Sequence, residues 1–184
     1  LGKSDRIDRI VREHGIDTTG VAGNWEAYLL QVVQQPEPGI DRALLVNPNY
    51  AQGHYARGFV GIHAGLDDAS LPSLEMAQRL SPFDPLLFAM MGTRAMAHVR
   101  LGQFEDAAQW AVKAAGRHNA HANILAIAAY CLALAGRAEE GRGFVASIHK
   151  TRPDYCNDDF LATFKFTADA EALFRKAAGE IGLA

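Results

Sequence analysis

The chain has 184 residues, of which 49% are hydrophobic and 21% charged, with a net charge of −3. Its length predicts one domain or slightly more, with a core large enough to fold without a metal or a disulfide. The composition argues against disorder and a membrane-spanning protein, and the lack of excess Lys and Arg argues against binding to nucleic-acid phosphates. The two cysteines show no metal-ligand spacing, which fits a reducing compartment, and we expect a cytoplasmic protein.

Residues 1–23 are expected to form an N-terminal helix and a loop. Ile7, Ile10 and Val11 make one apolar face of a helix that ends at Gly15, and Thr18–Gly23 is the loop. The sequence does not begin with methionine and shows no basic-then-apolar signal segment, which is consistent with a piece of a longer chain.

Residues 24–153 show an internal period that predicts the architecture. Three helical stretches each run into a glycine, at Gly65, Gly102 and Gly136, with intervals of 37 and 34 residues. The residues that close the units follow nearly the same interval: Pro48, Pro82, Asn119 and Pro153. A period of about 34 residues is typical of helix–turn–helix repeats. We therefore divide the segment into a degenerate unit (24–50) and three fuller units (51–84, 85–119 and 120–153).

The degenerate unit contains two short helical patterns. One runs over Trp25–Val32 and the other over Ile40–Val46, and the proline-containing stretch Gln35–Gly39 separates them.

The second and third units illustrate the predicted helix pairs. In the third unit, a helix over Leu86–Leu101 is expected to end at Gly102 in a left-handed conformation. The following helix carries Phe104 and three alanines on one face, and alanine lets antiparallel helices approach closely. In the second unit, Ser70 is expected to cap a helix with Pro72 in its first turn. No segment alternates with a period of two, so strands are not expected.

Residues 154–184 are expected to form C-terminal capping helices. The two helical patterns run over Asp159–Phe164 and Ala168–Ala178, with Thr167 at the N-cap of the second and Leu173 and Phe174 facing inward. An array of stacked units needs such caps because its outermost unit would otherwise expose an apolar face.

Small residues at fixed places in each unit resemble those of the tetratricopeptide repeat (TPR) family. They recur seven residues before the turn glycine and five after it: Gly58, Ala95 and Ala129, then Ser70, Ala107 and Gly141. The resemblance covers residues 47–153 well and 24–46 weakly. It implies an all-α fold, a right-handed superhelix of stacked antiparallel helical hairpins. The family's aromatic positions in the first helix hold His54, Met91 and Leu125 instead, which leaves the shape of any groove open.

A narrower resemblance concerns the segments between and after the units. Asn47–Ala51, Leu80–Pro85 and Phe160–Phe164 are similar to the C-terminal TPR regions of bacterial signalling proteins. In those proteins the region follows a class III cyclase domain or a winged-helix domain. This resemblance implies a regulatory or interaction module rather than a catalytic part.

The TPR resemblance also implies which side chains face the concave surface formed by the first helices. The residues that would bind a partner there are Gln52, Tyr55, Phe59, Ile62, Met96, Val99, Asn123 and Tyr130. Aromatic anchors with an adaptable methionine suit an apolar helix or an extended peptide. The alternative is that the terminal helices fold back and fill the groove, which would make these residues ordinary core; the sequence leaves both arrangements open.

No motif in the sequence predicts catalysis, a metal or a cofactor. His118 and His121 lie at a unit boundary without a carboxylate or thiol to complete a metal site. Cys131 is expected to be a small buried apolar residue, and Cys156 to be the more exposed cysteine. We therefore expect a non-enzymatic scaffold that binds a protein or peptide and contacts neither nucleic acid nor membrane. The alternative is a dimerisation or regulatory module of a cyclase or transcription regulator, and the chain could form a homodimer.

Overall fold

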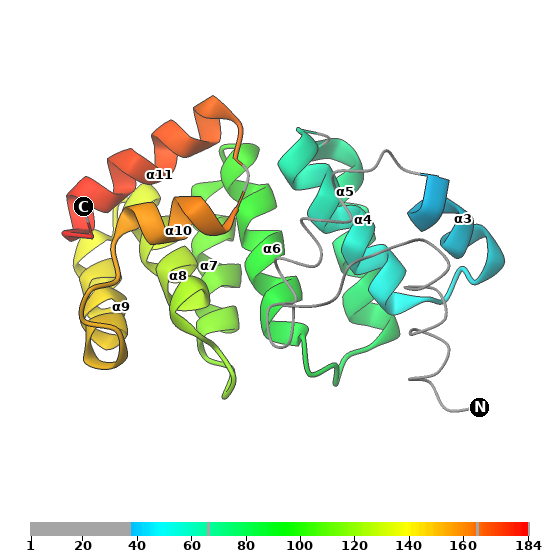
Figure 1. Ribbon diagram of the computed structural model, residues 1–184, viewed down its shortest axis with the longest axis horizontal. Helices are drawn as coiled ribbons and strands as arrows, with labels where there is room; N and C mark the ends of the chain where they lie inside the picture. The colour runs from blue at the N-terminus through cyan, green and yellow to red at the C-terminus, as the bar shows by residue number, and fades with distance from the viewer. Residues whose placement is uncertain (1–37, 66, 165, 184) are drawn as a thin grey trace.

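The computed structural model describes residues 38–65, 67–164 and 166–183, and all regular structure in these ranges is helical. The helices, labelled as in Figure 1, are α3 (Pro38–Val46), α4 (Ala51–Ala64), α5 (Asp67–Leu80), α6 (Leu87–Arg100), α7 (Phe104–Ala115), α8 (Ala122–Leu134), α9 (Ala138–Thr151), α10 (Asn157–Thr163) and α11 (Ala168–Ile181). The all-α prediction is confirmed over this part of the chain. The helix ending at Gly15, the loop Thr18–Gly23 and the helix over Trp25–Val32 lie outside the described residues.

Consecutive helices pack in pairs. The pairs are α4 with α5, α6 with α7, and α8 with α9, and their first helices also contact one another in the order α4, α6, α8. Figure 1 shows the helices following one another from α3 on one side to α9 on the other. The first helices of the three pairs therefore share one side of the molecule, the side to which the predicted groove residues belong.

Glycines in the left-handed region make the turns within the pairs. Gly65, Gly102 and Gly136 have φ angles of 79°, 70° and 77°. Each donates its backbone N–H to a carbonyl in the last turn of the preceding helix, as Gly102 does to Val99 at 3.0 Å. Glycine adopts this conformation without the steric cost that a Cβ would add. The predicted turn positions are confirmed.

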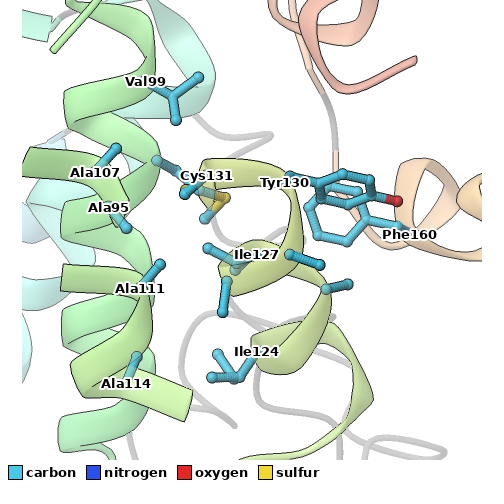
Figure 2. Close-up of a cluster of buried hydrophobic side chains, with 14 of the residues drawn as sticks. Ala95, Val99, Ala107, Ala111, Ala114, Ile124, Ile127, Tyr130, Cys131 and Phe160 are labelled. Carbon is cyan, nitrogen blue, oxygen red and sulfur yellow. The ribbon is translucent and has the colours of Figure 1, made fainter. Parts of the chain in front are cut away.

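Small residues let the helices of a pair lie close together. Ala107, Ala111 and Ala114 on α7 are completely buried, as the spacing of the alanines predicts. Figure 2 shows them on the same side as Ala95, facing the neighbouring helices. Because small side chains keep the backbones near each other, this seam between helices has little room for any larger residue.

The tightest approach is at Gly141 on α9. A Cβ placed on Gly141 would lie 2.8 Å from the carbonyl oxygen of Ala129 and 3.0 Å from Ile181. Gly143, on the same helix, has nothing within 4 Å of its Cβ position. Gly141 is thus a packing requirement, whereas Gly143 is not.

Helix α5 begins earlier than the sequence predicts. Asp67 is its first residue, so Ser70 is not the N-cap and Pro72 lies inside the helix instead of in its first turn. The helix continues through the proline because Ser73 and Leu74 are buried, with exposed fractions of 1% and 0%. Packing of Leu74 at Gly58, where an added Cβ would approach its Cγ to 2.6 Å, outweighs the lost backbone hydrogen bond.

Thr167 occupies the predicted N-cap position of α11, but its side chain makes no capping bond. Its hydroxyl instead accepts a hydrogen bond from Arg100 at 2.7 Å. The C-terminal segment is thereby fastened to the end of α6, which lies 67 residues earlier in the chain.

Over the described residues, none of the helices combines the length and apolar character needed to cross a membrane.

Candidate binding groove

The structure places most of the predicted groove residues in the interior. Exposed fractions of 3% or less are found for Tyr55, Phe59, Ile62, Met96, Val99 and Tyr130. Gln52 and Asn123 are half-buried. The side chains do lie along α4, α6 and α8, but in this conformation a partner could not reach the aromatic ones.

Phe164, which directly follows α10, covers the α4 end of this surface. The centroid of its ring lies 6.5 Å from that of Phe59 and 5.7 Å from that of the His63 imidazole. The rings of Phe164 and His63 are nearly parallel, with an interplanar angle of 7°. Phe164 itself is only 5% exposed. A residue more than 100 positions along the chain therefore occupies the place predicted for a partner.

Helix α10 covers the α8 end of the same surface. The ring of Tyr130 lies 4.8 Å from Phe160 and 5.4 Å from Phe174. Figure 2 shows Tyr130 leaving α8 on the side opposite Cys131 and meeting Phe160. Helix α8 is thus buried against α6, α7 and α9 on some of its sides and against the C-terminal segment on another.

The covering residues form an aromatic cluster of their own. Its members are Phe160, Phe164, Phe166 and Phe174, with neighbouring ring centroids between 4.9 and 5.6 Å apart. Such separations are typical of favourable tilted and edge-to-face aromatic pairs. The cluster therefore adds cohesion beyond the apolar area that it removes from water.

Polar bonds hold the covering segment in register. The hydroxyl of Tyr130 donates to the side-chain oxygen of Asn157 at 3.0 Å, in a buried position. Asn123 accepts a hydrogen bond from the Tyr155 hydroxyl at 2.7 Å and donates to Thr163 at 3.4 Å. These bonds satisfy polar groups that burial would otherwise leave without partners.

A small cavity lies between the groove residues and Phe164, which covers them. A cavity of about 10 Å³ lies among α4, α6, α8 and Phe164, which is room for a single water molecule at most. Of the two arrangements that the sequence leaves open, the described structure has the second, because the C-terminal segment folds back and fills the groove. The reason is physical, since this segment brings four phenylalanines to an apolar surface of the same chain.

Two titratable groups in α8 are buried and stay neutral at ordinary pH. Burial raises the pKa of the Tyr130 hydroxyl far above its usual value, and the neighbouring Tyr155 and Cys156 raise it further. Burial alone raises the pKa of the Cys131 thiol. A neutral thiol is a poor nucleophile, so Cys131 is a packing residue, as predicted, while Cys156 is the more exposed of the two.

Within the described ranges, no group of three His, Cys, Asp or Glu side chains lies close enough to hold a metal ion.

Sequence reasoning missed three participants in the groove. These are His63, which stacks on Phe164; Asn157, which accepts from Tyr130; and Phe166, which joins the aromatic cluster. The sequence does contain a signal for an aromatic cluster in this segment. Four of the nine phenylalanines in the chain fall within a short stretch: Phe160, Phe164, Phe166 and Phe174.

The chain matches no protein-family model, no curated protein and no solved structure.

Proposed function

We propose that this chain is a non-catalytic, TPR-like interaction module that binds a peptide or helix of a partner protein on its concave surface. In this proposal the helix pairs stack as a right-handed superhelix of antiparallel hairpins. The regular turn glycines, the alanine-lined seams and the contacts between first helices support this description. The expected setting is the cytoplasm, without nucleic-acid or membrane contact by this segment.

The observation that carries the proposal is that the groove already holds a protein segment. Phe160 and Phe164 lie against Tyr130 and Phe59, which belong to two different helix pairs. A surface that receives a short helix with its aromatic side chains has the shape and chemistry for helix-in-groove recognition.

Site-specific photo-crosslinking tests this function. A photoreactive amino acid at Gln52 or Asn123, the half-buried groove positions, should capture a partner in cells that make the full protein. The same amino acid at Gln109, an exposed position on α7, serves as the control. A discrete adduct at the groove positions but not at Gln109 supports the proposal. Equal labelling at the three positions, or none at the groove, contradicts it.

Dimerisation is the second candidate function, and exposed apolar side chains favour it. Leu45, Val46 and Phe83 are 83%, 81% and 93% exposed, far above the usual values for such residues. They lie at the end of α3 and in the α5–α6 connection. If they join two copies, the mass measured by light scattering should rise with concentration and fall when Val46 and Phe83 are replaced by serine. A constant monomer mass excludes this role.

A further inference from the structure

The two C-terminal helices are held in different ways. Helix α11 packs along α8 and α9, and its residues Ala177, Ala178 and Ile181 are at most 2% exposed. Its Ile181 reaches the close approach at Gly141 described above. Helix α11 is therefore a capping helix in the structural sense, with a continuous helix–helix contact.

The segment that enters the groove is held mainly by side chains. We call α10 together with Phe164 and Phe166 the aromatic strap. Helix α10 has only seven residues, and an isolated helix that short is not stable in water. Its stability therefore comes from its surroundings. These are the rings and side-chain hydrogen bonds that reach into the groove, together with two contacts to the C-terminal end: the Asn157 N–H donates to the Leu183 carbonyl at 2.9 Å, and Arg175 pairs with Asp158 at 3.1 Å.

The strap has fixed points on both sides. Before it, Tyr155 is buried at 3% exposure and bonds to Asn123 on α8. After it, Thr167 bonds to Arg100 and α11 packs on the helix pairs. Both flanking segments therefore have contacts with the helix pairs that do not involve the rings of the strap.

We propose that the aromatic strap is a built-in competitor for the groove, and that the partner presents a segment of the same chemistry. That segment is a short helix with a phenylalanine at position i, followed directly by a non-helical stretch with phenylalanines at i+4 and i+6, as at Phe160, Phe164 and Phe166. A hydroxyl side chain beside the second phenylalanine bonds to Asn123, as Thr163 does. This inference rests on the proposed function and names both its partner and its regulation.

The first two aromatic side chains of this segment match contact sites in the groove. The first ring fits between Tyr130 and Phe174, and the second lies against Phe59 and His63. The groove offers these sites to whichever segment supplies the rings. A partner must displace the strap, so its apparent affinity is its intrinsic affinity multiplied by the fraction of molecules whose groove is open.

The probe is a fluorescent peptide with the sequence of residues 157–167, and the control peptide has its three phenylalanines replaced by alanine. Fluorescence anisotropy measures binding to the full chain and to a variant with Phe164→Ser and Phe166→Ser. Because a tethered segment competes at an effective concentration in the millimolar range, we expect the variant to bind the probe at least about tenfold more tightly than the unaltered chain. The control peptide should bind neither protein.

A reversible lock provides the second arm of the experiment. Asn123→Cys and Thr163→Cys, in a Cys156→Ser background, allow a reducible thiol crosslinker to hold the strap on α8. The crosslinked protein should not bind the probe, and reduction should restore the binding that the same cysteine variant shows before it is crosslinked. Since both states are the same folded protein, this arm decides the matter even if the serine variant does not fold.

The remaining outcomes overturn the inference. Equal binding to the unaltered, serine and crosslinked proteins shows that the strap does not control the groove. No binding to any of them shows that the groove does not accept this chemistry, while an adduct at Asn123 in the crosslinking experiment would still support the proposed function. A doubled mass with the strap exchanged between copies would make a second copy the occupant.

Discussion

Two faces of α8 show two ways of burying a helix. Toward α6, α7 and α9 the seams are lined by small residues such as Ala107, Ala111 and Gly141, and the backbones lie close together. Toward the C-terminal segment, Tyr130 contacts the rings of Phe160 on α10 and Phe174 on α11 at about 5 Å. Packing on the first face requires small side chains, whereas packing on the second face requires large aromatic ones.

This difference shows which parts of the fold are fixed and which can be exchanged. A seam of small residues requires its own neighbouring helix, because only a backbone at that distance fits. An aromatic socket can accept any ring of suitable size. Substitutions should therefore have opposite size dependence on the two faces. Of the four experiments below, the first two test this size dependence, and the other two test polar bonds of the C-terminal segment.

The largest effect is expected from removing a ring on the strap side. Phe160→Ala should lower the free energy of unfolding by about 3–5 kcal/mol, because it leaves a cavity where a fully buried ring was. Urea denaturation followed by circular dichroism measures the change. Val112→Ala is the control, since Val112 is 40% exposed and lies outside the candidate dimer surface. If the two variants lose similar stability, the strap does not contribute to the core.

The next effect concerns added volume in a seam. Gly141→Ala should destabilise the protein by about 1–3 kcal/mol, because its Cβ would press on the carbonyl oxygen of Ala129. Gly143→Ala has open space and should instead stabilise α9 by up to about 1 kcal/mol. Thermal melting of the two variants compares them directly. The same sign for both would mean that the approach at Gly141 is not as close as described.

A smaller effect is expected from one buried hydroxyl. Tyr130→Phe keeps the ring but removes the donor to Asn157, which should cost about 1–2 kcal/mol. A double-mutant cycle with Asn157→Ala isolates the bond from the effects of each single change. Additive losses, with no coupling between the two positions, would show that the hydroxyl does not hold the strap.

The smallest effect is the pH dependence at the start of α10. The backbone N–H of Cys156 donates to Asp159 at 2.9 Å, and this bond lowers the pKa of the Asp159 carboxyl. A carboxyl whose pKa is lower when folded stabilises the protein above the ordinary aspartate pKa of about 4, and the stabilisation is lost as the pH falls through the folded value. NMR titration of the carboxyl measures that value, and Asp159→Asn should remove the pH-dependent part of the stability of α10. A pKa at or above the ordinary value contradicts the assignment.

The repeat period made the helix pairs predictable, but it could not predict that the C-terminal segment covers the groove. Turn glycines such as Gly102 and seam residues such as Ala107 recur at a fixed interval, so each position supports the others. The contact of Phe164 with Phe59 occurs once and joins distant segments, so a repeat period in the sequence cannot predict it. The side chains that the resemblance assigns to a groove lie on α4, α6 and α8, but the resemblance carried no account of what lies over them. The early start of α5 was missed for a similar reason, because tertiary packing of Leu74 overrides the local preference of Pro72.

The position of the strap along the chain has a consequence for biosynthesis. Protein chains emerge from the ribosome amino end first, and early segments begin to fold before later ones exist. The rings of Phe59 and Tyr130 are therefore made before Phe160 and Phe164 can shield them. A nascent chain at that stage exposes these aromatic side chains to other molecules, and the chain can cover them only after α10 and Phe164 have been synthesised.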